Sequence, residues 1–182
     1  MTNLYFIALL TPEDIEAKII AIQQNVSAKF QSRHALKSPP HITLVLPFKY
    51  DRVSEKDITE PLINFFLHFS PFAVQLDGFN CFERNRVVFI NVTQNETLKK
   101  LYDALIEFVK NNLPIVLQRQ HEQFTPHLTI ASRDLRKEMF HLAWNEFKEK
   151  TFSESWVADS AFLLRHKGKE WIPVKEFKFY GK

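Results

Sequence analysis

Two histidine–threonine pairs are the side chains of this 182-residue chain best suited to chemistry. Each pair stands in the same frame, Pro-His-x-Thr followed by a branched apolar residue, at residues 40–44 and 126–130. Two His-x-Thr tripeptides arise by chance in about one such chain in twenty, but a repeated frame that includes the proline is much rarer. We therefore interpret the two copies as one catalytic half-site that occurs twice.

Acid-base chemistry on a phosphodiester is the reaction that these side chains suit. In a strand, residues i and i+2 share a face, so His41 and Thr43 point one way, as do His127 and Thr129. One imidazole can accept a proton from water while the other protonates the departing alkoxide, and threonine hydroxyls can hold the non-bridging oxygens. We predict that His127 activates water and His41 protonates the leaving group, and pseudo-symmetry leaves the reverse assignment open. The chemistry requires no metal ion.

Matching strand-helix-strand units are expected to position the two motifs. The first unit comprises a strand, a helix and a motif strand at residues 4–10, 12–31 and 41–48. The second unit repeats this order at residues 86–92, 95–113 and 124–131. We interpret this as an internal duplication, and packing about a pseudo-twofold axis would line one cleft with both motifs.

The helix of the first unit has a clear start and a clear buried side. Thr11 is predicted as its N-cap, with Pro12 at the first helical position. Apolar residues then recur at spacings of three and four and predict one buried stripe. The stripe consists of Ile15, Ile19, Ile22, Val26 and Phe30.

The remaining segments complete an α+β pattern. Further helices are predicted at residues 58–69 and 134–148, and further strands at residues 72–79, 151–165 and 171–180. The expected architecture is bilobal, with pseudo-twofold duplicated units and antiparallel-rich sheets that line a central cleft. We expect one bilobal domain over residues 1–182.

Composition restricts the function classes. An apolar content of 45%, with eighteen Phe, predicts a packed globule, and a net charge of +3 is too small for a protein that coats nucleic acid through charge alone. Cys81 is the one cysteine, which excludes an internal disulfide and a cysteine-based zinc cluster. Three glycines exclude a glycine-rich phosphate loop. With no signal peptide and no run of membrane-spanning length, we expect a cytoplasmic protein that does not bind membranes.

The frames at residues 40–44 and 126–130, together with the opening run Leu-Tyr-Phe-Ile-Ala-Leu at residues 4–9, resemble the 2H phosphoesterases. This family includes the bacterial 2′-5′ RNA ligase-like proteins and cyclic nucleotide phosphodiesterases. The resemblance implies metal-independent hydrolysis of 2′,3′-cyclic phosphates or related diesters of a nucleotide or RNA end, with reversible 2′-5′ RNA ligation in some members. It implies His41 and His127 as the acid-base pair and Thr43 and Thr129 as phosphate holders, with no cofactor.

The chain departs from this family at one position. Many relatives carry an arginine where this chain has Ser132, and Arg133 follows one residue later. A shift of one residue turns a strand side chain to the opposite face unless the strand has ended or bulged. Arg133 is therefore our candidate phosphate contact, and Arg165 is a weaker second candidate.

Other notable side chains have simpler interpretations. The remaining histidines share no frame and are interpreted as surface or partly buried residues: His34, His68, His121, His141 and His166. His121 and His127 lack the acidic or cysteine partners that a metal site needs. Phe48 and Phe124 flank the motifs and could stack on a base, but core packing is favoured for both, and Trp171 is assigned to a half-buried last strand.

Two other functions stay open at this point. One is a non-catalytic module that binds RNA or a nucleotide in the same cleft, and the other is an interaction protein in which both motifs are ordinary strands. Two titratable groups in matched frames favour the enzyme over both. No obligate protein partner is inferred, and a monomer is expected.

Overall fold

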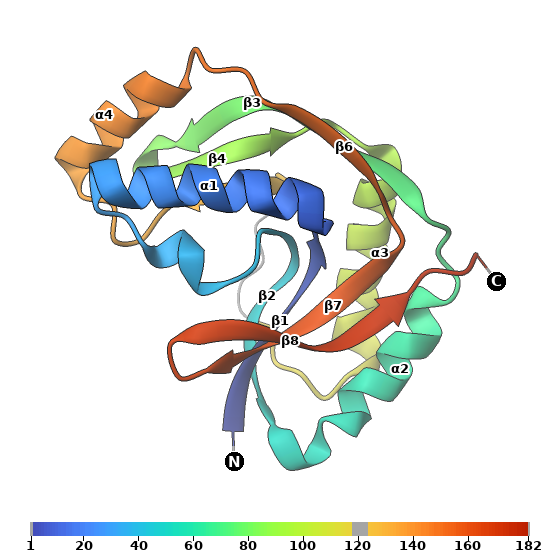
Figure 1. The fold of residues 1–182 in the computed structure, drawn as a ribbon. Coiled ribbons are helices and arrows are strands. Elements are labelled where there is room, and N and C mark those ends of the chain that lie inside the picture. The colour runs from blue at the N-terminus through green and yellow to red at the C-terminus, as the bar shows by residue number, and fades with distance from the viewer. Residues whose placement is uncertain (1, 118–123, 182) are drawn as a thin grey trace.

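The fold is that of a computed structural model, which describes residues 2–117 and 124–181, apart from the side chain of Arg52 (Figure 1). Within these residues the α-helices are α1 (Glu13–Phe30), α2 (Lys56–Phe66), α3 (Glu96–Asn112) and α4 (Lys137–Phe147). The strands are β1 (Thr2–Leu10), β2 (His41–Asp51), β3 (Phe72–Phe82), β4 (Val87–Val92), β5 (His127–Ala131), β6 (Ser153–Ala158), β7 (Ser160–Lys167) and β8 (Glu170–Lys178). Short 3₁₀ turns are η1 (His34–Lys37), η2 (Arg52–Ser54) and η3 (Glu83–Asn85).

All eight strands form one curled antiparallel sheet, in the order β6-β3-β4-β5-β2-β1-β7-β8. The motif strands β5 and β2 are neighbours at its centre. From this pair outward, each side has a motif strand, then the first strand of the same unit, then two more strands. The order is therefore symmetric about the β2–β5 pair, and the predicted α+β fold with duplicated units is confirmed.

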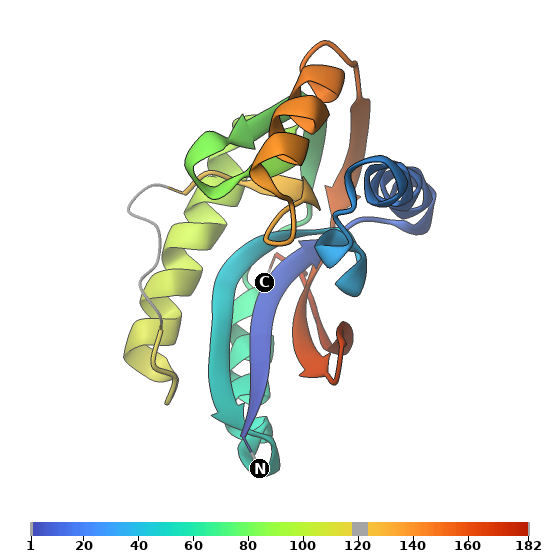
Figure 2. The same ribbon diagram turned by 90° about the vertical axis from the view of Figure 1, so that its left-hand side faces the viewer.

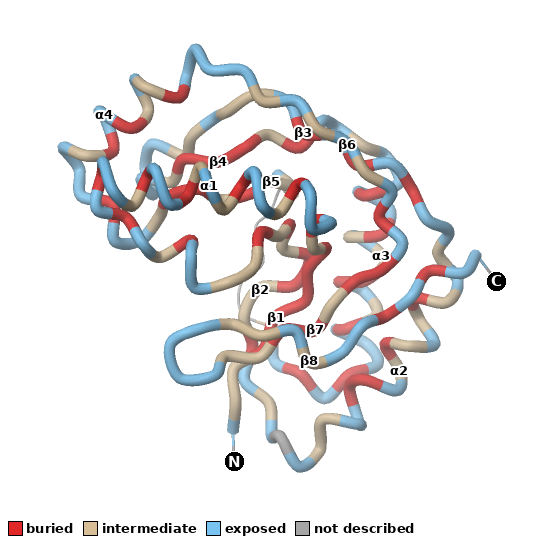
Figure 3. Tube along the Cα trace, viewed as in Figure 1, coloured by how far each residue is buried: buried red, intermediate tan, exposed pale blue. Residues whose placement is uncertain are grey.

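Alternation along the central strands separates two apolar layers. Tyr5, Ile7 and Leu9 of β1 are fully buried in the main core. Phe6 and Ala8 point to the other face and form a small second cluster with Leu164 of β7. Because both faces of β1 are buried, its sequence over residues 4–10 is a continuous apolar run with no alternation of polar residues. Figure 3 shows buried residues along the strands and also on the helices.

The helices pack as two pairs. α1 and α4 contact each other and lie against β3, β4 and β5, whereas α2 and α3 contact each other and lie against β8 and β2 (Figures 1 and 2). Within the described chain, no helix is both long enough and apolar enough to cross a bilayer.

α1 differs from its sequence prediction in two details. Pro12 occupies the N-cap position and makes no side-chain cap, so the prediction of Thr11 as N-cap is wrong. The buried stripe contains Gln23, whereas Ile22 is only partly buried. The buried place that the periodicity assigned to Ile22 is therefore taken by the neighbouring Gln23.

Two other segments depart from expectation for physical reasons. α2 begins at Lys56 and contains Pro61 in its interior. Proline has no N–H to donate to the carbonyl group of Asp57, but the helix tolerates this because Asp57 is exposed and its carbonyl can bind water. The run predicted as one strand at residues 151–165 is two strands, β6 and β7. β6 pairs with β3 and β7 pairs with β1, so the break near Asp159 lets one apolar run serve both sides of the sheet.

Candidate active site

Strand register brings the two motifs together. Ile42 of β2 pairs with Leu128 of β5, and both are fully buried on the core side. In an antiparallel pair with this register, His41 lies opposite Thr129 and Thr43 lies opposite His127. All four side chains therefore share the face away from the core, and each histidine neighbours the threonine of the other copy.

Each histidine is oriented by the same backbone contact. His41 Nδ1 lies 2.8 Å from the carbonyl oxygen of Pro39, and His127 Nδ1 lies 2.8 Å from that of Thr125. A carbonyl oxygen can only accept, so Nδ1 carries the proton and Nε2 is the nitrogen that titrates. The proline between each carbonyl and its histidine fixes the local backbone, which explains why both frames contain it.

A phenylalanine on the neighbouring strand packs against each imidazole. Phe6 of β1 lies 4.8 Å from His41, and Phe89 of β4 lies 5.1 Å from His127, between ring centroids. Sequence analysis missed both residues. Part of the signal was present, because Phe6 and Phe89 both stand within the first strand of their unit, predicted at residues 4–10 and 86–92.

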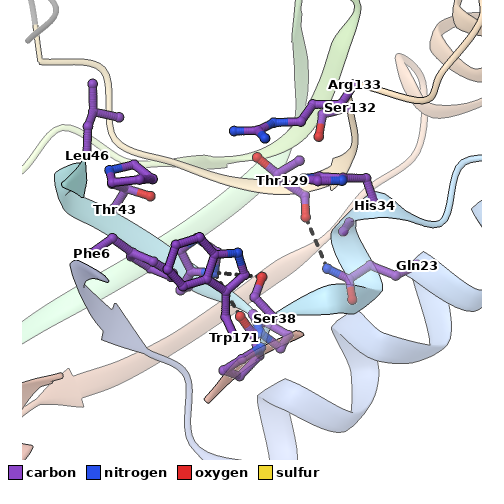
Figure 4. Close-up of a pocket in the computed structure, with 15 residues that line it drawn as sticks. Phe6, Gln23, His34, Ser38, Thr43, Leu46, Thr129, Ser132, Arg133 and Trp171 are labelled. Atoms are coloured by element: carbon purple, nitrogen blue, oxygen red, sulfur yellow. Dashed lines mark hydrogen bonds between the residues drawn. The ribbon is translucent and has the colours of Figure 1, made fainter. Parts of the chain in front are cut away.

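A cavity of about 180 Å³ lies over this face of the sheet. Its lining includes His41, Thr43, Thr129 and Arg133, and it also includes His34, which sequence analysis had not assigned to the site. Figure 4 shows Thr129, Arg133 and His34 on one side of the cavity, with Phe6 and Trp171 across from them. None of the described lining residues is acidic, which suits an anionic ligand.

Backbone geometry explains how Arg133 reaches the cavity. β5 ends at Ala131, and Arg133 has φ +49°, in the left-handed region. The Asp134 N–H donates to the Ser132 carbonyl at 2.5 Å and closes a tight turn. Since the strand has ended, the shift of one residue no longer sends the side chain to the opposite face, and Arg133 lines the cavity.

Asp134 fastens this turn to the segment after α1. Its carboxylate accepts a hydrogen bond of 2.7 Å from the Ser32 hydroxyl and one of 2.8 Å from the Arg33 backbone N–H. Ser32 is buried. The contact holds a left-handed conformation that costs about 1–3 kcal/mol in a residue other than glycine. It also fixes the turn that carries Arg133 relative to the segment that leads into His34.

The electrostatic surroundings favour the neutral forms of His41 and His34. Burial lowers the pKa of His41 from 6.5 to about 4, the His127 charge lowers it further, and the Pro39 carbonyl acts in the opposite direction. Burial also lowers the pKa of His34, as do the charges of Arg133 and Lys37. His41 is therefore uncharged at neutral pH, which is the state that a general base needs.

Gln23 is a second supporting residue that the sequence analysis missed. Its Nε2 donates to the Thr129 carbonyl at 3.1 Å, so α1 supports the motif strand β5 from the side (Figure 4). The available signal was a glutamine at a stripe position, four residues after Ile19 and three before Val26. Such a buried amide requires a partner, and strand backbone supplies it.

The remaining candidates lie elsewhere or pack in the core. Arg165 forms an ion pair of 3.2 Å with Glu55, away from the residues that line the cavity. Phe48 is buried and stacks on Tyr5, so the favoured core role is confirmed. Phe124 stacks on Tyr102, with ring centroids 3.8 Å apart. His121 lies outside the described residues.

Comparison with known proteins adds family and fold. The family model described as the 2′-5′ RNA ligase superfamily matches residues 11–170. A protein of Geobacillus sp. (strain WCH70) named "Putative phosphoesterase" is 26% identical over 156 residues, which cover 85% of this chain and 86% of that one. A relative of the same name from Geobacillus thermodenitrificans is 30% identical over 108 residues, 59% and 58% of the two chains.

Solved structures share the fold over nearly the whole chain. E. coli LigT complexed with 3′-AMP has a TM-score of 0.72 at 18% identity and covers 98% of this chain and 99% of its own. The protein TT0787 of Thermus thermophilus has a TM-score of 0.68 at 21% identity, with 99% of both chains covered. At this level of identity the likeness concerns the fold.

Proposed function

This chain belongs to the 2′-5′ RNA ligase superfamily of phosphoesterases, and from that premise we propose that it hydrolyses a 2′,3′-cyclic phosphate or a 2′-linked phosphodiester of a nucleotide or RNA end. The observation that carries the proposal is the pairing of two histidines on one sheet face, each with Nδ1 on a backbone carbonyl. Structures of E. coli LigT with 3′-AMP and ATP are consistent with a nucleotide substrate. The reverse reaction, 2′-5′ ligation of RNA ends, would use the same groups.

The lowered pKa of His41 supports one assignment of the two roles. Neutral His41 accepts the proton of the attacking water at Nε2, water oxygen bonds to phosphorus, and the bond from phosphorus to the ribose oxygen breaks. His127 then donates its Nε2 proton to the departing alkoxide. This is the reverse of the first assignment made from sequence, and it follows because a group with a pKa of about 4 carries almost no proton to donate at pH 7.

Hydroxyls and a guanidinium would hold the phosphate during this step. Thr43 and Thr129 can each donate to a non-bridging oxygen, and Arg133 can form a charge-assisted, two-pronged contact. The two histidines, the two threonines and Arg133 would thus supply both proton transfer and charge stabilisation. Each carbonyl bonded to Nδ1 additionally stabilises the imidazolium that forms on its histidine.

Turnover in the presence of EDTA tests the proposal directly. The purified protein is incubated with 2′,3′-cyclic nucleotides and with 2′-5′ dinucleotides, alongside the variants His41→Ala and His127→Ala. We expect product from the wild type and a loss of about 10³-fold in kcat for either variant. The matched control is His141→Ala, an exposed histidine on α4, which should retain full activity.

The result also separates the enzyme from a binding module. A module would bind these nucleotides tightly and release no product with any of them. Activity that survives both histidine substitutions would overturn the mechanism even if hydrolysis were observed.

A further inference from the structure

A second cavity, of about 450 Å³, adjoins the catalytic one. The two cavities share the side chains of Gln23, Ser38, Pro39 and Trp171 in their linings. They are therefore neighbouring compartments, and we take a ligand with its phosphate between the two motifs to extend past these four side chains into the second compartment.

Charge is divided unequally between the two compartments. The catalytic compartment is lined by His34, His41 and Arg133, with no acid among its described residues. The second compartment is lined by Glu16 and Glu170 as well as Lys37. An anionic group is therefore favoured in the first compartment and disfavoured in the second, which instead suits a neutral group that carries hydrogen-bond donors.

The walls of the second compartment are largely apolar. They include Ile20, Leu36 and Pro173 together with the Trp171 ring. The indole is held in place, because the Phe6 and His166 rings lie 4.7 and 5.0 Å from it, both edge-on. A fixed aromatic ring beside aliphatic walls is the usual environment of a stacked heterocycle.

Two buried polar atoms beside this compartment have no hydrogen-bond partner within the described chain. They are Gln23 Oε1 and Thr11 Oγ1, on side chains that are only 2% and 8% exposed. Both residues line the compartment. Buried acceptors are rarely left unpaired, so a ligand that donates a hydrogen bond here is favoured. Glutamine amides pair well with the amino group and adjacent ring nitrogen of adenine.

We propose that the second compartment binds the nucleobase of the substrate, a base with an exocyclic amino group, such as adenine or cytosine. The inference rests on the proposed function, because it places the phosphate between the two motifs. The base lies against Trp171 and Pro39, and its amino group faces Gln23. Base recognition and phosphate chemistry are thereby separated into two compartments with a shared wall.

A cavity-filling variant tests the subsite. Ile20→Trp fills the second compartment from α1, and Ala21→Trp is the matched control, because Ala21 is exposed on the same helix and lines a different cavity. The substrates are 2′,3′-cyclic AMP, its N6,N6-dimethyl analogue, and the 2′,3′-cyclic phosphate of methyl riboside, which has no base. Equal melting temperatures of the two variants establish that both are folded.

We expect Ile20→Trp to raise KM for 2′,3′-cyclic AMP about tenfold and to leave KM for the base-free substrate unchanged. In the wild type, dimethylation should raise KM about fivefold, because it removes the donated hydrogen bond. Equal KM values for all three substrates in the wild type, or equal effects of Ile20→Trp on the nucleotide and the base-free substrate, would overturn the proposal.

Failure of the proposed function gives a different result, namely no turnover of any substrate by the wild type. In that case an NMR titration with adenosine, and with ribose as the control, decides the subsite. Chemical-shift changes at Ile20, Leu36 and Trp171 with adenosine but not with ribose would support the base subsite. The absence of such changes would overturn it.

Discussion

The half-site around His41 and the half-site around His127 are alike in their chemistry and different in their surroundings. Each imidazole donates from Nδ1 to a carbonyl two residues earlier and packs on a phenylalanine of the neighbouring strand. Each phenylalanine in turn contacts a second aromatic ring. That ring is Trp171 beside Phe6 in the first half-site and Phe82 beside Phe89 in the second.

The differences lie in what surrounds these shared parts. The first half-site carries the strongly lowered pKa of His41 and adjoins the second cavity through Trp171. The second half-site leads into the turn that carries Arg133, fastened by Asp134. In the proposed mechanism the two half-sites hold equivalent histidines, and their surroundings place the neutral base on one side and the cationic phosphate contact on the other.

The largest effect on turnover should come from removing either of the two histidines, and a second substrate then distinguishes the base from the acid. Either His41→Ala or His127→Ala should lower kcat by about 10³-fold on a 2′,3′-cyclic nucleotide. On a nucleoside 3′-(p-nitrophenyl) phosphate, whose leaving group departs without protonation, the deficit of His127→Ala should shrink by at least about tenfold while that of His41→Ala persists. Steady-state kinetics on both substrates measure this, and the opposite pattern would restore His127 as the base.

The next effect concerns the turn that only the second half-site has. Arg133→Gly should lower kcat/KM by about 10²-fold through loss of the charge-assisted phosphate contact. The same change should raise the free energy of unfolding by about 1 kcal/mol, because glycine adopts positive φ without strain. Arg86→Gly is the control, since Arg86 also has positive φ (51°) but is exposed at a hairpin.

Arg86→Gly should give the gain in stability without the loss of activity. Urea denaturation and kinetics on both variants measure the two quantities. Unchanged activity of Arg133→Gly would show that the second half-site holds the phosphate with its threonine alone.

A smaller effect is expected at Asp134, which ties the turn after β5 to the segment after α1. Asp134→Ala removes two hydrogen bonds and leaves the buried Ser32 hydroxyl without its carboxylate partner, so stability should fall by about 1–3 kcal/mol. KM should rise about fivefold to tenfold with little change in kcat, because Arg133 loses its orientation while both histidines keep theirs. Asp134→Asn retains an acceptor and should recover part of the lost affinity. A drop in kcat at unchanged KM would contradict this positioning role.

The smallest effect is a pH dependence that follows from the lowered pKa of His41 in the first half-site. Between pH 4 and 6.5 the unfolded chain binds a proton at His41 that the folded chain does not, so the free energy of unfolding rises with pH across this window. His41→Gln should remove a pH-dependent contribution of about 1–3 kcal/mol. Denaturation curves at pH 4.5 and 7 measure it, with His141→Gln as the control. An unchanged slope would mean that the folded protein does not shift this pKa.

Several elements could be predicted from sequence because they depend on local periodicity. The motif strands, α1, α3 and the duplicated order of units follow from apolar spacing and from turn residues. The Asn95 cap of α3 is confirmed by its hydrogen bond from the Leu98 N–H. Where a run looked uniform, as at residues 151–165, periodicity could not show that its two parts pair with different strands.

The chemistry of the site was visible in the sequence because His-x-Thr places two functional groups on one strand face by geometry alone. The tertiary structure alone decided which strands became neighbours, and the β2–β5 register set each histidine opposite the other copy's threonine. It also decided the lowered pKa of His41, the return of Arg133 to the cavity, and the presence of Gln23, His34 and Trp171 beside the motifs. These features depend on burial and on contacts between residues distant in the chain, which local sequence spacing does not specify.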